Sequence, residues 1–390
     1  MGRCEWRGRL FKMRNSAVAS EQFVKIPAFM EKGFEDLKRE VVERGFCSLC
    51  GTCAAFCEKI RIEGRERVAG GEAEGGVEAS KPTFCEDYDT VCGMCYTLCP
   101  RTFLPLEEIE QKIFGRSRSS ERENALGVFR KCFALRSSLK HSGQDGGAVT
   151  ALLAYAIEEH ILDCAVVTKT AGENWRVSVE VARDYATLRK SAGTKYTIFP
   201  SVLGVRSAID AGCERIGFVG LPCQIQGLRK VQTTEQPYEV HQERIKLLIG
   251  LFCMENFSES MLDFVDKHVL SLEKVRKFDI KGKEMLVYDE SGEKHEIPLA
   301  EIERFVGEGC LVCTDFASEL ADISVGSVGS PEGFSTVIVR SEIGEEIVEG
   351  AIRKGYVEAK ELKEEGLEEI EKVARLKKKR RGSSEKEKER

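Results

Sequence analysis

The sequence lacks any apolar run near the ~20 residues that a membrane-spanning helix needs, and Leu247–Phe252 is typical of its short hydrophobic stretches. The N-terminus also lacks the apolar core of a secretory signal. We therefore expect a cytoplasmic protein, or one peripheral on the cytoplasmic face of a membrane, with no transmembrane segment. The formal net charge of −6 gives no overall reason to expect a nucleic-acid partner.

Two nucleotide-binding fingerprints are missing as well. No G-x-G-x-x-G follows a predicted strand, which lowers the expectation of NAD(H) as the direct redox partner. There is no G-x-x-x-x-G-K-[ST] loop either, which argues against an ATPase of the P-loop class.

Cysteine, in contrast, is abundant, with 16 among 390 residues. A secreted disulfide scaffold would be short and rich in loops. This chain is long enough for two domains and perhaps an extra module, and it has clear helix and strand patterns. Reduced, metal-binding cysteines in a cytoplasmic protein are therefore the better interpretation.

Eight cysteines form two runs near the N-terminus. The runs are Cys47-x2-Cys50-x2-Cys53-x3-Cys57 and Cys85…Cys92-x2-Cys95-x3-Cys99-Pro100. This spacing is typical of two-cluster bacterial ferredoxins, in which the fourth cysteine of each run ligates the other cluster. It predicts two [4Fe–4S] clusters, one held by Cys47, Cys50, Cys53 and Cys99 and the other by Cys57, Cys85, Cys92 and Cys95.

Two features depart from the ferredoxin pattern. Glu58 replaces the proline expected after Cys57, and Cys85 lies seven residues before Cys92 instead of three. The longer spacer widens a loop but leaves four ligands. Structural zinc sites are the alternative, because Cys4 zinc also uses paired C-x-x-C, but zinc sites rarely use the three-in-seven spacing.

From about residue 127 helical patterns alternate with short apolar runs, which predicts an α/β domain. We expect strands at 164–169, 177–183, 215–219, 246–252, 322–328 and 336–340, helices at 148–160, 202–211, 258–269 and 345–354, and a hairpin at 275–298. Before it, 34–44 is expected to be helical, 1–33 a disordered leader and 63–81 a flexible insertion. The polar segment 115–126 is expected to be a linker, and the charged segment 376–390 a disordered tail.

A second set of cysteines lies in this α/β domain. Cys223 and Cys253 follow predicted strands, and residues just past the ends of parallel strands meet at one edge of a sheet. The C-x-x-C pair Cys310 and Cys313 could complete a four-thiolate site. The alternative is that Cys223 and Cys253 are small buried hydrophobes. The remaining cysteines, Cys4, Cys132, Cys164 and Cys213, are isolated.

Two glycine-containing loops are candidates for a phosphate or flavin site. The loop Ser142–Thr150 precedes a predicted helix, whose free N–H groups favour a phosphate, and its glycines allow close approach. The loop Ser191–Tyr196 combines a glycine, a hydroxyl donor and Lys195. For each loop a simple turn is the alternative.

Taken in order, these segments resemble one family. QDGGAVTALL, SAGTKY, GLPCQIQGLRK, LIGLFC and GCLVCTDFASELADISVG occur within residues 127–340 as they do in the beta subunit of coenzyme F420 hydrogenases and dehydrogenases. The front half resembles the ferredoxin-like module fused to the electron-input subunit of archaeal F420H2 dehydrogenases. The leader, the Gly/Glu-rich insertion and the charged tail are not signatures of that family.

The resemblance implies an α+β/α/β fold, with a two-cluster ferredoxin-like module (34–114) followed by an α/β FAD- and iron–sulfur-binding domain (127–375). It implies a third [4Fe–4S] cluster at Cys223, Cys253, Cys310 and Cys313. It also assigns to the cofactor pocket the residues Gln144, Asp145, Gly146, Gly147, Thr150, Ser191, Gly193, Thr194, Lys195 and Tyr196.

The implied reaction is oxidation of reduced coenzyme F420 by hydride transfer to FAD, followed by single-electron transfer through the clusters to a complex I-like membrane assembly. No catalytic side chain is implied. Lys195 and Arg229 could attract the polyanionic tail of F420, although an ordinary solvated side chain is the favoured interpretation of Arg229. Two alternatives remain, namely a soluble ferredoxin:F420 oxidoreductase and a flavin-free electron-transfer subunit.

Overall fold

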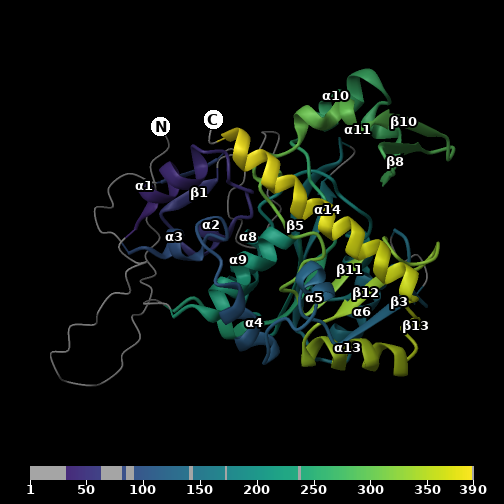
Figure 1. Ribbon diagram of the computed structural model, residues 1–390. Helices are drawn as coiled ribbons and strands as arrows, with labels where there is room; N and C mark the ends of the chain where they lie inside the picture. Colours follow the sequence, from purple (N-terminus) through teal and green to yellow (C-terminus); the bar gives the residue numbers. More distant parts are fainter. Residues whose placement is uncertain are drawn as a thin grey trace.

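The structure is a computed structural model that describes residues 32–62, 81–84, 92–139, 144–171, 174–235 and 239–388, with side chains up to residue 380 (Figure 1). Cys85 and nearly all of the predicted leader and insertion lie outside these ranges. Among the described helices, none is both long and apolar enough to cross a membrane.

An eight-stranded mixed sheet, in the order β13-β3-β12-β11-β7-β6-β4-β5, organises most of the chain. Its middle strands β11, β7, β6 and β4 run parallel, whereas the outer neighbours pair antiparallel. β6 (Ile216–Gly220) and β7 (Ile245–Leu251) are nearly continuous apolar runs because helices cover both faces of the sheet there. The other strands are β3 (Lys131–Ser137), β4 (Cys164–Ala171), β5 (Arg176–Ala182), β11 (Ile323–Gly326), β12 (Ser335–Val339) and β13 (Val357–Glu361).

The strands predicted in the α/β domain are confirmed to within two residues at each end. Two strands were missed, β3 and β13, which pair with each other next to β12. β13 has the sequence VEAKE, with mainly half-buried or exposed side chains. An edge strand of this kind carries no apolar alternation from which it could be predicted.

Helices pack on the sheet in two separate cores. Alternate residues of β4 enter them, because successive strand side chains point to opposite faces: Val166 enters one core and Val167 the other. The Val167 core contains α6 (Ala148–Glu158), α7 (Tyr185–Lys190) and α13 (Glu342–Arg353). The Val166 core contains α8 (Leu203–Asp210) and α9 (Pro222–Thr233).

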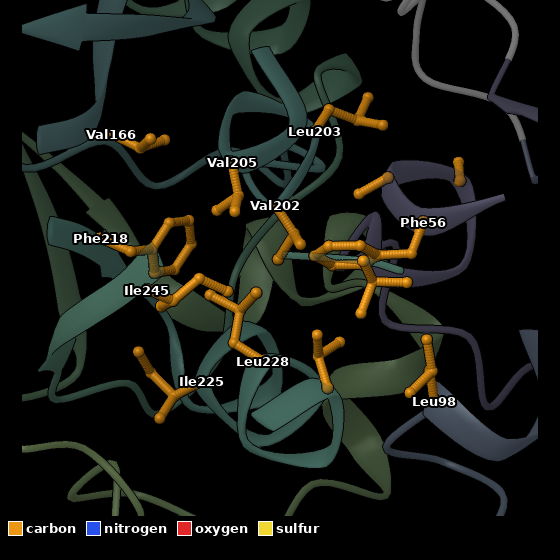
Figure 2. Close-up of a cluster of buried hydrophobic side chains, with 14 of the residues drawn as sticks. Phe56, Leu98, Val166, Val202, Leu203, Val205, Phe218, Ile225, Leu228 and Ile245 are labelled. Atoms are coloured by element: carbon orange, nitrogen blue, oxygen red, sulfur yellow. The ribbon is translucent and has the colours of Figure 1, made fainter. Parts of the chain in front are cut away.

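The N-terminal part forms a small module packed onto the second of these cores. Figure 2 shows Phe56 and Leu98 of the module in one apolar cluster with Val202 and Leu228, all four at most 2% exposed. The module and the sheet therefore share one hydrophobic core. The module's elements are α1 (Phe34–Leu37), the π-helical turn η2 (Lys38–Val42), α2 (Thr52–Phe56), the antiparallel pair β1 (Ile60–Ile62) and β2 (Pro82–Phe84), α3 (Met94–Leu98) and α4 (Leu106–Phe114).

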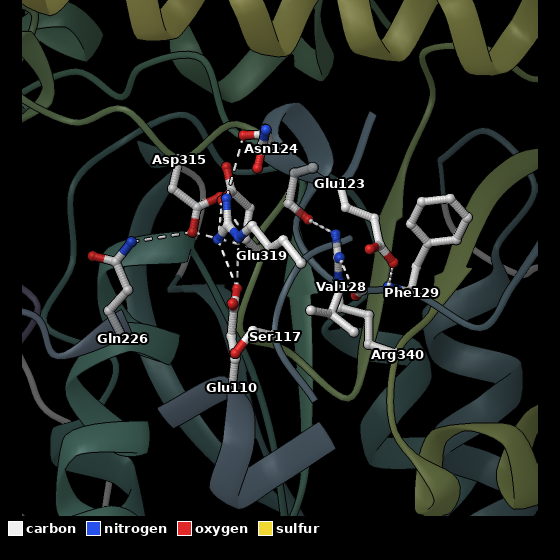
Figure 3. A network of polar contacts seen from close by, with 12 residues as sticks. Glu110, Ser117, Glu123, Asn124, Val128, Phe129, Gln226, Asp315, Glu319 and Arg340 are labelled. Atoms are coloured by element: carbon white, nitrogen blue, oxygen red, sulfur yellow. Dashed lines mark hydrogen bonds and ion pairs between the residues drawn. The ribbon is translucent and has the colours of Figure 1, made fainter. Parts of the chain in front are cut away.

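The polar segment 115–126 is a packed junction, so its prediction as a linker needs correction. Arg118 forms ion pairs of 2.8 Å with Glu110 of the module and with Glu319 of the α/β domain. Glu123 lies in α5 (Glu121–Leu126) and accepts a 2.9 Å hydrogen bond from Arg116. Figure 3 shows these contacts around Glu110, Glu123 and Glu319. Charged side chains that look like a solvated linker in the sequence thus join the two parts of the chain.

A second, three-stranded antiparallel sheet stands apart from the large one in Figure 1. Its first two strands, β8 (Val275–Lys281) and β9 (Glu284–Asp289), form the predicted hairpin, and β10 (Lys294–Pro298) extends it to a meander. Its core includes residues of α10 (Ser260–His268) and α11 (Leu299–Ile302), and α12 (Glu308–Leu311) follows along the chain.

The charged segment after residue 376 belongs to the long helix α14 (Glu364–Lys388), so the prediction of a disordered tail from that point is wrong. Ile370, Ala374 and Lys377 recur at helical spacing on one face, and each is at most 2% exposed. The Lys377 ammonium donates to the backbone oxygens of Cys253 (2.6 Å) and Asp315 (2.9 Å). Tertiary contacts therefore order a stretch whose composition is typical of disorder.

Candidate functional site

Four thiols of the module line one small cavity and constitute the first thiol group. Three come from the segment around the start of α2, and the fourth follows α3: Cys47, Cys50, Cys53 and Cys99. The chain can bring three of them together because Gly51 has a φ of 89°, which lets the backbone turn sharply before α2. Burial, together with smaller contributions from neighbouring thiols, raises the pKa of Cys47 to about 12 and that of Cys99 to about 11.

The second thiol group comprises Cys57, Cys92 and Cys95. Burial raises the pKa of Cys95, and Cys57 and Cys92 are the next largest causes, so both lie near Cys95. Cys85, the fourth predicted ligand, lies outside the described residues. Cys99 is a further cause of the raised pKa of Cys95, which places the second group next to the first.

The third thiol group lies at the carboxyl edge of the large sheet. Cys223 is in the first turn of α9 just after β6, and Cys253 follows the neighbouring parallel strand β7. Cys310 in α12 donates to the Asn256 oxygen (3.8 Å), and Cys313 follows α12. Burial raises the pKa of Cys253 to about 12, with Cys310 and Cys313 among the further causes. Cys253 and Cys223 thus each have Cys310 and Cys313 among their electrostatic neighbours.

The backbone segments that carry the first and third thiol groups are in direct contact. A Cβ placed on Gly309 would lie 2.5 Å from the Cys47 carbonyl oxygen, so the two backbones meet where only a glycine fits. Lys230, on the same helix as Cys223, is fully buried and donates to the backbone oxygens of Cys99 and Phe103, each at 2.6 Å. α9 therefore carries one ligand candidate at its start and holds the module with its later turns.

A cavity of about 590 Å³ lies between the two glycine loops and the small sheet. The Gln144 side chain joins all three: it accepts from the Thr194 backbone N–H (3.2 Å) and donates to the Phe278 oxygen (3.3 Å). Other residues that line the cavity are Thr170, Trp175, Ala192, Gly193, Lys195, Leu272, Glu273, Val275, Arg276, Lys277 and Glu290. The volume is in the range of sites for small cofactors.

The ten residues assigned to the pocket divide into two sets. Four of them line the cavity: Gln144, Gly193, Thr194 and Lys195. The other six, Asp145, Gly146, Gly147, Thr150, Ser191 and Tyr196, are adjacent but do not line it. Gly146 was predicted to let a ligand approach the backbone, but it has a different role, which is to let protein backbone pack closely. A Cβ there would lie 2.3 Å from the backbone atoms Leu135 O and Ser335 N. Asp145 has a φ of 53° and a pKa raised by burial and by Asp279.

The cavity residues that sequence reasoning missed include Trp175 and several residues of β8. Trp175 packs edge-on against Phe278 with ring centroids 4.9 Å apart, and its indole N–H donates to the Val275 oxygen (3.1 Å). Arg276 and Lys277 add positive charge to the same wall. Only the placement of the small sheet over the loops brings these residues to the cavity, and no local signal in the sequence indicates it.

Lys195 and Arg229 lie in different environments. The Lys195 ammonium donates to the backbone oxygens of Ser191, Ala192 (3.3 Å) and Gly193 (2.9 Å), and burial lowers its pKa to about 8. Arg229 is 3% exposed, donates to the Leu320 oxygen (2.7 Å) and forms a 2.8 Å ion pair with Asp322. The interpretation of Arg229 as a solvated side chain is therefore wrong, and it does not line the cavity either.

One backbone segment connects the cavity with the third thiol group. Phe257 pairs with the loop that carries Lys195: its N–H donates to the Tyr196 oxygen (2.8 Å), and its own oxygen accepts from Ile198 (2.8 Å). The Asn256 oxygen accepts from the Gly307 N–H (2.9 Å), three residues before Cys310. Cys253 lies in the same short segment, so residues 253–257 contact the loop at the cavity and also carry a cysteine of the third thiol group.

Two family models match the chain, both described for the beta subunit of coenzyme F420 hydrogenase/dehydrogenase. The model of the N-terminal part matches residues 131–204, and the model of the C-terminal part matches residues 213–365. Together they span the large sheet, the cavity and the third thiol group.

Individual relatives extend the match into the module. The F subunit of the F(420)H(2) dehydrogenase of Methanosarcina mazei is 32% identical over 87% of this chain and 91% of its own length. The coenzyme F420-dependent sulfite reductase of Methanocaldococcus jannaschii is 38% identical over 87% of this chain, which spans half the length of that protein. A solved chain of the F420-reducing [NiFe] hydrogenase complex from Methanosarcina barkeri superimposes with a TM-score of 0.65 and 36% identity, over 67% of this chain and 93% of that one.

Proposed function

Because the chain belongs to the family of coenzyme F420 hydrogenase/dehydrogenase beta subunits, we propose that it is the electron-input subunit of an F420H2 dehydrogenase. Members of this family are electron-transferring subunits of F420-dependent oxidoreductases. The observation that carries the proposal is the continuous arrangement of one cofactor-sized cavity and three neighbouring thiol groups. The similarity to the dehydrogenase relative from Methanosarcina mazei extends over both parts of the chain.

The thiol groups have the donor chemistry of [4Fe–4S] sites. Iron–sulfur clusters are held by four cysteine thiolates. Here four cysteines line one cavity, and four others are electrostatic neighbours near the sheet edge. Burial and mutual repulsion raise the pKa of most of these thiols, a cost that bound iron would relieve. The proposed ligands are Cys47, Cys50, Cys53 and Cys99 for the first cluster, Cys57, Cys85, Cys92 and Cys95 for the second, and Cys223, Cys253, Cys310 and Cys313 for the third.

The cavity fits FAD by its size and its lining. Gln144, Gly193, Thr194 and Lys195 offer polar groups on one side, and Trp175 and Phe278 offer an apolar wall on the other. FAD, when bound, accepts a hydride from reduced F420 and releases its electrons singly, a conversion that the clusters require. The chain's own contribution is to hold the ring systems in place and to exclude competing reactions.

The order of the sites gives the proposed direction of electron flow within the chain. Cys253 adjoins the cavity through the segment 253–257, Gly309 joins the third thiol group to the first, and Cys95 joins the first to the second. Electrons would therefore pass from the cavity to the third, the first and the second cluster in turn. The acceptor beyond the module is proposed to be a complex I-like membrane assembly, with the chain peripheral on its cytoplasmic side. The alternative is a soluble ferredoxin:F420 oxidoreductase, whose redox partner is ferredoxin.

Lys195 provides a test of anion recognition in the cavity. Below pH 8 its ammonium is charged, and as the pH rises through about 8 the charge is lost because burial lowers its pKa. We expect the KM for F420H2 to rise about tenfold between pH 7 and 9. Lys195→Ala should raise KM already at pH 7, or release FAD, and should remove this pH-dependent increment.

The matched control for this prediction is Lys190→Ala, which removes an exposed ammonium five residues away at the end of α7. It should leave KM, FAD content and their pH dependence unchanged. If Lys195→Ala also left all three unchanged, Lys195 would have no part in recognising F420 or FAD.

The proposed function is tested on anaerobically purified protein by its UV–visible spectrum, with iron and flavin quantified, before and after addition of reduced F420. We expect about one FAD and about twelve irons per chain, and bleaching by F420H2 but not by NADH. About eight irons without flavin would instead indicate a two-cluster electron-transfer subunit. Reduction of F420 by reduced ferredoxin, catalysed by a stable monomer, would favour the soluble oxidoreductase.

A further inference from the structure

Two cations, the half-buried Arg101 and the buried Lys377, flank the third thiol group from opposite parts of the chain. Burying a cation is costly unless negative charge compensates it. Lys377 is 2% exposed, and the Nε of Arg101 is buried with no hydrogen-bond partner among the described residues. The groups that compensate them include the sulfurs of the cysteines, together with Asp315 in the case of Lys377.

Arg101 contacts two thiol groups at once. It follows Cys99 by two residues, and its backbone N–H donates to the Cys99 sulfur (3.4 Å). Its side chain lines the cavity of the first thiol group, and Cys313 of the third group is among its electrostatic neighbours. Cys223 and Cys50, one from each group, are also among its electrostatic partners. One guanidinium therefore lies between the two groups.

Lys377, unlike Arg101, is associated with the third thiol group alone. It reaches the site from α14, far along the chain, and its ammonium is fixed by the backbone oxygens of Cys253 (2.6 Å) and Asp315 (2.9 Å). The sulfurs among its main electrostatic partners, Cys253, Cys310 and Cys313, all belong to the third group.

We propose that Arg101 is a shared counter-charge that raises the reduction potentials of the first and third clusters, and that Lys377 raises the potential of the third alone. The inference rests on the proposed function, which supplies the clusters and, through the flavin, the electrons. One-electron reduction adds one negative charge to a cluster, so a fixed cation nearby stabilises the reduced form more than the oxidised form. Both are positioning residues, since they act on clusters held by other side chains.

The test is a redox titration of the anaerobically purified holoprotein, followed by electron paramagnetic resonance, with iron quantified in each variant. Arg101→Gln should lower the midpoint potentials of two clusters, the first and the third. Each should fall by about 59 mV or more, which corresponds to a tenfold change in the equilibrium constant of a one-electron reduction. Lys377→Gln should lower only one of these two. Arg101→Lys, which keeps the charge, should recover most of the shift.

Arg122→Gln is the matched control, because Arg122 pairs with Glu364 and Glu371 and has Cys132, which belongs to none of the three thiol groups, as its neighbouring cysteine; it should leave all potentials unchanged. If Arg101→Gln kept the iron content of the wild type and its midpoint potentials were unchanged, the inference would be overturned. Loss of iron in Arg101→Gln, or equal shifts in Arg101→Gln and Arg101→Lys, would show a structural role and overturn it as well. A wild-type protein without iron would instead reject the proposed function.

Discussion

Replacing Cys313 by alanine should lower the iron content from about twelve to about eight atoms per chain, while FAD stays bound. Cys313 is buried, has Arg101 as an electrostatic neighbour and is proposed to share the third cluster with Cys223, Cys253 and Cys310. Three thiolates would remain, but the third cluster is the proposed link between the cavity and the module. Reduction of the remaining clusters by F420H2 should therefore fall to background, as followed by stopped-flow absorbance.

Cys132→Ala is the control for this experiment. Cys132 lies on β3 and pairs in register with Ile338 of β12, away from the three thiol groups. Its removal should leave iron and cluster reduction at wild-type values. If Cys313→Ala retained about twelve irons, or if F420H2 still reduced the module at the normal rate, the third cluster would not be the link.

Replacing Gly309 by alanine should separate the first and third thiol groups without removing any ligand. The new Cβ would lie 2.5 Å from the carbonyl oxygen of Cys47, and because that atom is backbone, the module and α12 must move apart. We expect a loss of about 1–3 kcal/mol in stability from overpacking. Flavin reduction by F420H2 should be retained, whereas electron transfer into the module should slow about tenfold or more, since small displacements of reacting centres have large kinetic effects.

The neighbouring substitution Glu308→Ala serves as the control, because the Glu308 side chain is 62% exposed and its ion pair with Lys81 is at the surface. It should change neither stability nor rate. Stopped-flow traces at flavin and cluster wavelengths distinguish the two steps, and thermal unfolding reports stability. Equal rates of flavin and module reduction in Gly309→Ala and wild type would contradict the proposed path through this contact.

The fold was predictable where local pattern and tertiary environment agree. β6 and β7 are apolar along their length because both faces are covered, and such runs between helical patterns indicate a parallel sheet. The grouping of cysteines followed from the same kind of rule, because Cys223 and Cys253 follow adjacent parallel strands. β13 and α14 were not predictable, because their charged sequences are indistinguishable from solvated segments.

The cavity shows where local pattern ceases to be informative. The two glycine loops were recognisable, and Gln144 does join them. A residue larger than glycine does not fit at position 146, however, because the backbone atoms Leu135 O and Ser335 N, from two strands of the sheet, lie too close. Trp175 and the β8 residues reach the cavity only through the position of the small sheet. Neither contact can be predicted from the spacing of residues along the sequence.

Residue order along the chain was sufficient to identify the cysteine runs, the alternation of helices and strands, and the family resemblance, because each is a property of neighbours in sequence. The charges around the thiols are of another kind. Arg101, Lys230 and Lys377 come from three distant segments, and each looks like an ordinary surface cation until folding buries it beside sulfur. The three-dimensional packing establishes these contacts, since the electrostatic effect of a charge depends on its distance in space and on the water excluded around it.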